Sequence, residues 1–231
     1  RYYIYFNPGG SNFKGTVYFD DFTVPGAQTS EIVKTKGKWK YFDKGTEPSA
    51  DWTSPSYKDT AWKQANAPFG YGFTNNKTTI NYGQDVNNKF ITTYFRQQFN
   101  IVDTSTYKSL ILNIKADDGA IVYLNGKEVS RYNMPIGKFD NSTLALNEKN
   151  SSKDSIFQRI ILPETLLVMD TNVLAVEIHQ ASVQTADMLF DASLTATDLS
   201  KGLIRCPYLQ KGSETGILVR WRTLENTSSR V

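Results

Sequence analysis

The chain has 231 residues, of which 39% are hydrophobic, so it is long enough to bury one large core or two small ones. Its 26 Lys and Arg and 23 Asp and Glu are interspersed, so no basic stripe marks a nucleic-acid-binding surface. No apolar run approaches the roughly 20 residues that cross a bilayer, so membrane insertion is not expected. The single cysteine, Cys206, excludes an internal disulfide and a cysteine-based zinc cluster.

The first predicted element is a hairpin within residues 1–24, where two β-rich runs flank an Asn-Pro-Gly-Gly cluster. A hairpin of this size is marginal in water, so it must pack on another domain. Residues 25–30, PGAQTS, have the composition of a linker. Because Arg1 opens inside a strand-like run, we expect the chain to be a slice of a longer protein.

The central segment, residues 31–198, consists of short alternating runs separated by turn residues, which is typical of an antiparallel β-sandwich. In the run 172–180 Leu174, Val176 and Ile178 share one face, and we expect that face to point into the core. The other face carries Val173, Ala175, Glu177 and His179. Strands are predicted at 39–42, 92–101, 109–116, 120–129, 155–162, 172–180 and 188–196, and one-turn helices at 55–62 and 162–167.

The last segment, residues 199–231, contains two strand-like runs, PYLQ and GILVRWRT, around a polar turn. It predicts the opening of a further β-sandwich. The predicted fold class is therefore all-β, with β-rich partial segments at both ends of a central sandwich.

The stretch DDGAIVYLNGKEV begins with two adjacent acids, Asp117 and Asp118, which could form a metal or acid/base site or only start a hairpin. Asn125-Gly126 supplies the positive φ values of a type I′ turn. Gly119 suits a tight turn, in which Asp118 can hydrogen-bond its own backbone. No chemical partner lies nearby in sequence, so we favour the structural interpretation.

No catalytic constellation is visible. His179 is the only histidine, so neither a dinuclear phosphoesterase site nor a His-rich zinc site can be built from these residues. HExxH, GxSxG, Walker and GxGxxG motifs are absent from the sequence. Acids are numerous, but none stands out as the acid and base of a glycosidase. We therefore expect no catalysis from this chain.

Six stretches occur in a characteristic order: DTAWKQANAPFGYG, TTINYG, TYFRQQF, ADDGAIVYLNGKEVSRYNMP, NVLAVEIHQ and DMLFDASLTA. Over residues 36–196 they resemble the galactose-binding-like jelly-roll modules of large secreted bacterial proteins, and more distantly the sugar-binding domains of β-galactosidase-type glycosidases. This resemblance implies an antiparallel jelly-roll β-sandwich in a secreted or cell-surface protein, with a polysaccharide or glycan as its partner.

Two shorter resemblances concern the ends. GLIRCPYLQKGSETGILVRWRT resembles the start of the fibronectin-type domain that precedes the catalytic domain of purple-acid-phosphatase-like metallophosphoesterases, with Cys206 where Gly is usual. VYFDDFTV resembles the last strand of a carbohydrate-binding jelly roll. They imply that residues 1–24 end one module and residues 199–231 begin a third. Any phosphoesterase activity would then lie outside this chain.

Aromatic side chains are common in sugar-binding sites, because the C–H face of a pyranose stacks on an aromatic ring. Residues 51–88 hold several rings among Asn and Gly, and Trp52, Tyr71 and Tyr82 are the candidates for an exposed ligand-binding platform. Ordinary packing under a long loop is the alternative. The family pattern implies that Trp62 is a core residue, together with Phe69.

No cofactor is required by the resemblance, but such modules often carry a structural Ca²⁺ held by carboxylates and carbonyls. The resemblance points to Asp191 on the last strand of the main module, and to Asp20 and Asp21 on the corresponding strand of the preceding one. The alternative is that these acids face solvent.

The favoured hypothesis is a non-catalytic carbohydrate-binding or spacer module of an exported multidomain protein. The alternative is a structural subunit of an extracellular fibre or adhesin. In that case edge strands in residues 1–24 and 203–231 would pair with neighbouring domains or chains.

Overall fold

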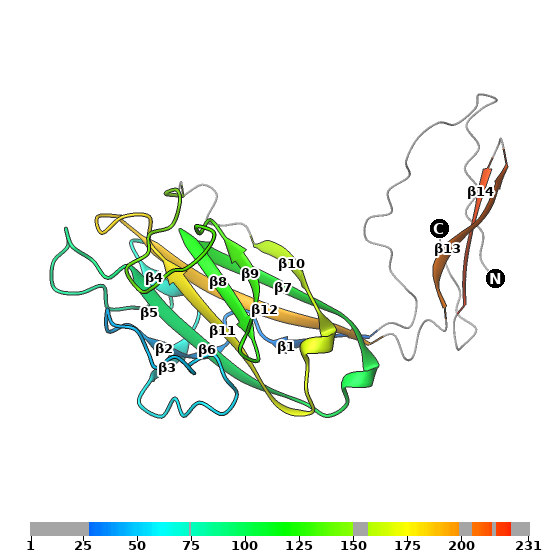
Figure 1. The fold of residues 1–231 in the computed structure, drawn as a ribbon, viewed down its shortest axis with the longest axis horizontal. Helices are drawn as coiled ribbons and strands as arrows, with labels where there is room; N and C mark the ends of the chain where they lie inside the picture. The colour runs from blue at the N-terminus through cyan, green and yellow to red at the C-terminus, as the bar shows by residue number, and fades with distance from the viewer. Residues whose placement is uncertain (1–27, 74, 150–156, 199–204, 214–215, 223–231) are drawn as a thin grey trace. The chain divides into compact units, whose positions relative to one another are not determined.

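The computed structural model describes residues 28–73, 75–149, 157–198, 205–213 and 216–222. Nearly all regular structure in them is strand, and two sheets pack as a sandwich, so the predicted all-β antiparallel sandwich is confirmed (Figure 1). Residues 1–24 lie outside the described residues, and the predicted module boundaries stay a prediction.

Sheet A has the strand order β10-β7-β12-β4-β5, and β1 also pairs with β12. β10 runs antiparallel to β7 and β4 antiparallel to β12, whereas the short β5 runs parallel to β4. The strands are β1 (Gln28–Val33), β4 (Phe69–Tyr71), β5 (Thr78–Thr79), β7 (Tyr107–Asp117), β10 (Gln158–Leu162) and β12 (Met188–Asp198).

Sheet B has the order β3-β2-β6-β11-β8-β9, and all its pairs are antiparallel. The strands are β2 (Lys38–Phe42), β3 (Lys63–Asn66), β6 (Thr92–Ile101), β8 (Gly119–Leu124), β9 (Lys127–Tyr132) and β11 (Asp170–His179).

Two other features complete the description. Single 3-10 turns are η1 (Thr104–Thr106) and η2 (Glu164–Leu166), and η2 falls within the helical turn predicted at 162–167. The helical turn predicted at 55–62 is wrong, because this stretch forms irregular turns. Strands β13 (Arg205–Ser213) and β14 (Gly216–Arg222) form an antiparallel hairpin, as the two runs there predicted.

The core between the sheets is built on aromatic rings. Phe95 of β6 lies 4.2 Å from Phe190 of β12, between ring centroids, and 5.2 Å from Phe69 of β4. Trp39 of β2 meets Phe190 edge-on at 5.0 Å. Val176 pairs with Phe95 and so shares this inner face, which confirms that its side of β11 points into the core.

The opposite face of β11 is buried as well. Val173, Ala175, Glu177 and His179 are each at most 3% exposed. A strand on one side of a two-layer sandwich would normally show this face to water. It is covered here because the loops 43–62 and 133–149 lie over what we call the outer face of sheet B.

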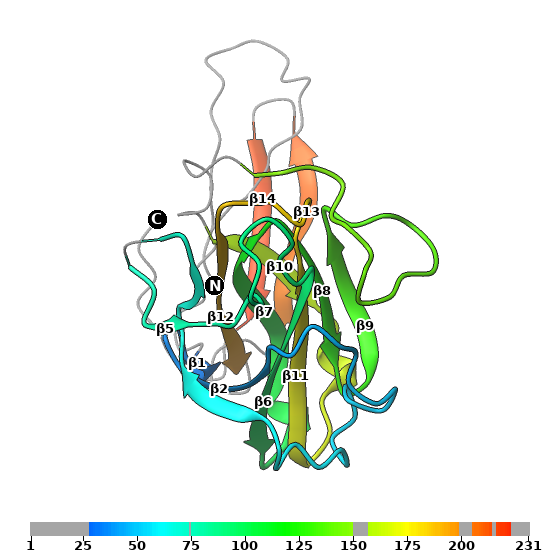
Figure 2. The same ribbon diagram turned by 90° about the vertical axis from the view of Figure 1, so that its left-hand side faces the viewer.

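The long connections of sheet B leave the sandwich at one end. Phe42 pairs with Tyr94, and His179 pairs with both Thr92 and Gly119, so β2 and β11 end where β6 and β8 begin. Figure 1 shows loops 80–91 and 180–187 beyond the strand ends, and the turned view in Figure 2 looks onto that end. The connections are 43–62, 80–91, 133–149 and 180–187. No helix in the described residues is long and apolar enough to cross a membrane.

Candidate functional site

The Asp-Asp-Gly stretch before β8 anchors two loops. The Asp118 carboxylate accepts the backbone N–H of Lys149 at 2.7 Å and that of Ala181 at 2.8 Å. A Cβ on Gly119 would lie 2.7 Å from Met134 Sδ, so the loop packs directly on the glycine. Asp118 therefore bonds to distant backbone rather than to its own, and the structural interpretation holds.

The turn at the far end of this hairpin is as predicted. Asn125 and Gly126 have φ values of +52° and +84°, as a type I′ turn requires. Leu124 pairs with Lys127 across the two-residue loop. Within the part of the chain that the structure describes, no three His, Cys, Asp or Glu side chains gather in a way that could hold a metal ion.

The predicted aromatic platform is wrong for two of its three residues. Trp52 and Tyr71 are each only 6% exposed. Trp52 stacks on Trp62 at 6.1 Å, and the Tyr71 hydroxyl accepts a hydrogen bond from Gln180 Nε2. Burial raises the pKa of Tyr71 to about 12. Both rings are packed under loops because large aromatics contribute most to stability when covered.

The third platform residue, Tyr82, is half-buried, and its ring lies 4.9 Å from that of Tyr71. Sugar binding by Tyr82 stays a prediction. Trp62 and Phe69 were expected in the core, and both are buried.

Asp191 is buried rather than solvent-facing. Its Oδ1 accepts the backbone N–H of Lys36 at 3.0 Å. Burial raises the pKa of Asp191, and the hydrogen bond from Lys36 opposes that rise. Asp20 and Asp21 lie outside the described residues, so the calcium site stays a prediction.

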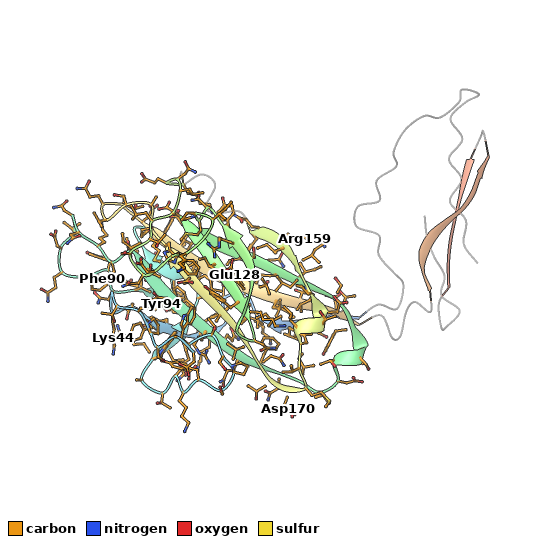
Figure 3. The ribbon with its side chains drawn as sticks, in the orientation of Figure 1. Lys44, Phe90, Tyr94, Glu128, Arg159 and Asp170 are labelled. Carbon is orange, nitrogen blue, oxygen red and sulfur yellow. The ribbon has the colours of Figure 1, made fainter. Side chains whose placement is uncertain are left out.

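The outer face of sheet B carries a polar cluster, and the register of its strands arranges these residues in rows across the sheet. Thr92, His179 and Gly119 form the row nearest the loop end, and Tyr94, Glu177 and Ile121 form the second row. Arg96, Ala175 and Tyr123 form the third. In Figure 3 Tyr94 lies toward the same end of the sandwich as Phe90, whereas Asp170 lies toward the other.

Glu177 is the centre of the cluster. The Tyr123 hydroxyl donates to Glu177 Oε1 at 2.5 Å. His179 Nε2 lies 3.2 Å from Glu177 Oε2, within ion-pair distance but without hydrogen-bonding geometry. Burial, and then the charge of Glu177, raise the pKa of Tyr94 and of Tyr123, so both hydroxyls keep their protons.

The imidazole of His179 is held from its other side. Its Nδ1 donates to the Thr143 carbonyl at 2.8 Å, because a carbonyl can only accept. The Thr92 hydroxyl lies 3.0 Å from the same nitrogen and donates to the Asn141 carbonyl at 2.8 Å. These contacts attach loop 133–149 to the first row and direct Nε2 toward Glu177.

Arg96 holds the other covering loop. Its side chain is fully buried, and Nη1 donates to the carbonyl oxygens of Trp52 and Ser54. Its Nε donates to Asp59 Oδ2 at 3.1 Å, and the guanidinium lies 5.0 Å from the Tyr57 ring centroid. A planar fork of donors suits several carbonyls and a carboxylate together. These side-chain hydrogen bonds hold the loop in place of the backbone hydrogen bonds of the helical turn predicted at 55–62.

The second row lies in a seam between the two loops. Trp52 packs on Tyr94 and Tyr123 from one side, at centroid distances of 5.1 and 5.6 Å. Thr143 and Asn141 cover the first row from the other side, and Asn141 Nδ2 donates to the Gly45 carbonyl at 3.4 Å. We call the group Tyr94, Glu177, His179 and Tyr123 the seam.

Two buried polar atoms of the seam lack a hydrogen-bonding partner among the described residues. They are the Tyr94 hydroxyl, on a residue 1% exposed, and His179 Nε2. Both flank Glu177. A buried polar group without a partner costs about 1–3 kcal/mol, so such groups in a folded protein mark unmet hydrogen-bonding capacity.

The sequence pattern alone does not predict this cluster. It placed Glu177 and His179 on the face of β11 away from the core but gave that face no cover. The signal available was a charged residue inside each of two apolar strands, Arg96 and Glu177, together with a Trp-containing loop after β2. Charges are rarely placed in central strands unless something polar covers them.

Comparison with known proteins gives no family. No family model matches the chain, and no curated protein matches it.

Several solved structures are similar to this chain, each over a minor part of its own length. A β-glucuronidase 2 from Bacteroides uniformis is 21% identical over 74% of this chain and 18% of that one, with a TM-score of 0.47. A β-glycosidase from Bacteroides vulgatus is 14% identical over 87% of this chain and 25% of that one, at 0.44. A β-glucuronidase from uncultured Clostridium sp. is 12% identical over 92% and 36%, at 0.44. The chain thus spans a minor part of these glycosidases, and likeness at this level gives no evidence on its ligand.

Proposed function

We propose that the chain is a non-catalytic carbohydrate-binding module of an exported multidomain protein. The observation that supports the proposal is Tyr82, a half-buried ring in loop 80–91 that lies 4.9 Å from the Tyr71 ring and 5.8 Å from Lys89 Nζ. Sugar sites combine aromatic walls with a few fixed polar groups in this way. The chain itself does no chemistry in this proposal, and a phosphoesterase domain would lie elsewhere in the protein.

Binding is tested on a glycan array with the purified chain. Retention of plant, algal or bacterial polysaccharides is expected. Silence across all three classes would contradict the proposal and favour a spacer. Turnover of p-nitrophenyl phosphate or p-nitrophenyl glycosides by the chain alone would contradict its non-catalytic part.

A further inference from the structure

One segment at the loop end of the sandwich is closed on itself. The backbone N–H of Phe90 donates to the Tyr82 carbonyl at 2.9 Å, so the two ends of residues 82–90 meet. Directly before them, the backbone N–H of Asn81 donates to the buried carboxylate of Asp43 at 2.8 Å. Figure 3 shows Phe90 at this end of the molecule. A compact surface loop with adjoining ends is an Ω-loop, a form that is frequently functional.

The interior of this Ω-loop is filled by one of its own side chains. Lys89 is only 7% exposed, and its Nζ donates to the Val86 carbonyl at 2.7 Å. The same Nζ lies 5.8 Å from the centroid of the Tyr82 ring, which in turn lies 4.9 Å from the ring of Tyr71. The loop is thus ordered before any ligand arrives, and such preorganisation favours affinity.

The Ω-loop exposes amide side chains beside a partly open ring. Gln84, Asn87 and Asn88 are exposed, and their amides are not hydrogen-bonded to any other residue that the structure describes. Asp85 accepts the backbone N–H of Asn87 on Oδ1 at 2.8 Å and that of Asn88 on its carbonyl at 3.1 Å, so a tight turn carries both amides. Tyr82 is half-buried.

These groups suit the hydroxyls of a sugar. A pyranose C–H face stacks on an aromatic ring, and a side-chain amide can donate to one hydroxyl and accept from its neighbour. Within residues 81–88 the only charged side chain is that of Asp85, which is exposed. A carboxylated sugar would meet a like charge on this loop, whereas a neutral sugar would not.

We propose that Ω-loop 82–90 binds a neutral glycan, with a sugar ring on Tyr82 and its hydroxyls bonded by the amides of Gln84, Asn87 and Asn88. The inference rests on the proposed carbohydrate-binding function and names the ligand class and the contacts of that site. Recognition then depends on exposed side chains of one loop, so it can be weakened without disturbing the core.

Four variants separate binding, charge and folding. Asn87→Ala and Asn88→Ala each remove one exposed amide, so both should melt at the wild-type temperature. Gln64→Ala is the matched control, because it removes an exposed amide from β3, outside the loop. Lys44→Ala tests for charge recognition, because this exposed ammonium, 5.3 Å from the Phe42 ring, belongs to the adjoining loop 43–62.

The test is affinity electrophoresis of the full chain through gels containing galactomannan, xyloglucan or polygalacturonate. We expect a neutral gel to retard the wild type, Gln64→Ala and Lys44→Ala equally, with polygalacturonate having no effect. Asn87→Ala and Asn88→Ala should each weaken that binding roughly fivefold, as loss of one neutral hydrogen bond predicts, and the double variant should bind more weakly than either.

Other outcomes overturn the inference in distinguishable ways. Retardation of the double variant at the wild-type level would overturn the role of the loop amides and leave carbohydrate binding intact. Retardation by polygalacturonate alone, or loss of binding in Lys44→Ala, would overturn the neutral ligand class. Retardation by none of the three gels would overturn the neutral-glycan site, and silence on the glycan array as well would remove the proposed function.

Discussion

Replacing Arg96 by Met should release loop 43–62 from the outer face of sheet B. The guanidinium donates to the Trp52 and Ser54 carbonyls and pairs with Asp59 at 3.1 Å, and it has no exposed surface. Met keeps much of the length and removes every donor. Removing one partner of a buried ion pair costs about 3–5 kcal/mol, because the remaining polar groups lose their compensation. Since Asp59 is 15% exposed, water recovers part of its loss, and we expect about 3 kcal/mol.

The assay is equilibrium unfolding in urea followed by tryptophan fluorescence. Trp52 and Trp62 belong to this loop and pack on sheet B, so the folded-state emission of Arg96→Met should also shift toward that of exposed tryptophan. Arg131→Met is the control, because Arg131 pairs with Glu128 near the surface, where such pairs contribute about 1 kcal/mol or less. An Arg96→Met variant within about 1 kcal/mol of the wild type, with unchanged emission, would refute the role given to Arg96.

Three further predictions concern single positions. Gly70→Ala should destabilise the fold by about 1–3 kcal/mol in urea unfolding, because its φ is +156° and a Cβ would lie 1.9 Å from a carbonyl oxygen of β12; a neutral result would show that β4 can shift. Asp118→Ala should cost about 2–3 kcal/mol and speed hydrogen exchange in the two loops it holds, and unchanged exchange would contradict its anchoring role. Burial raises the pKa of Asp191 above its ordinary 3.8, so the wild type loses stability as pH rises through that window. Asp191→Asn should therefore melt higher than the wild type near neutral pH and equally below pH 3.8, and a lower melting point near neutral pH would contradict this sign. Calorimetric titration of the wild type with Ca²⁺ tests the predicted calcium site, and absence of both heat and a thermal shift would rule it out.

The strands that alternation predicts are those with a full apolar face. Runs such as 92–101 and 188–196 in the sequence lie within β6 and β12, because each must bury every second side chain. β3 and β5 were missed for the opposite reason. The sequences KQAN and TT have no apolar face and are held only by pairing with neighbouring strands.

The seam could not be derived from alternation, because its residues come from three separate strands, β6, β8 and β11, and its cover from two loops. Trp52 was predicted as an exposed ring, but it lies against the sheet because Arg96, 44 residues later, binds its carbonyl. Glu177 and His179 were correctly grouped on one face of a strand. Their burial follows from the loops that cross that face, and loop paths are not encoded in strand periodicity.

The central claim is that the chain binds a carbohydrate through the loops of the sandwich. A crystal structure of the chain with an oligosaccharide that the glycan array identifies tests it most directly. We predict a sugar ring stacked on Tyr82, the half-buried ring of loop 80–91. A sugar that contacts none of the loops 43–62, 80–91, 133–149 and 180–187 would contradict the claim.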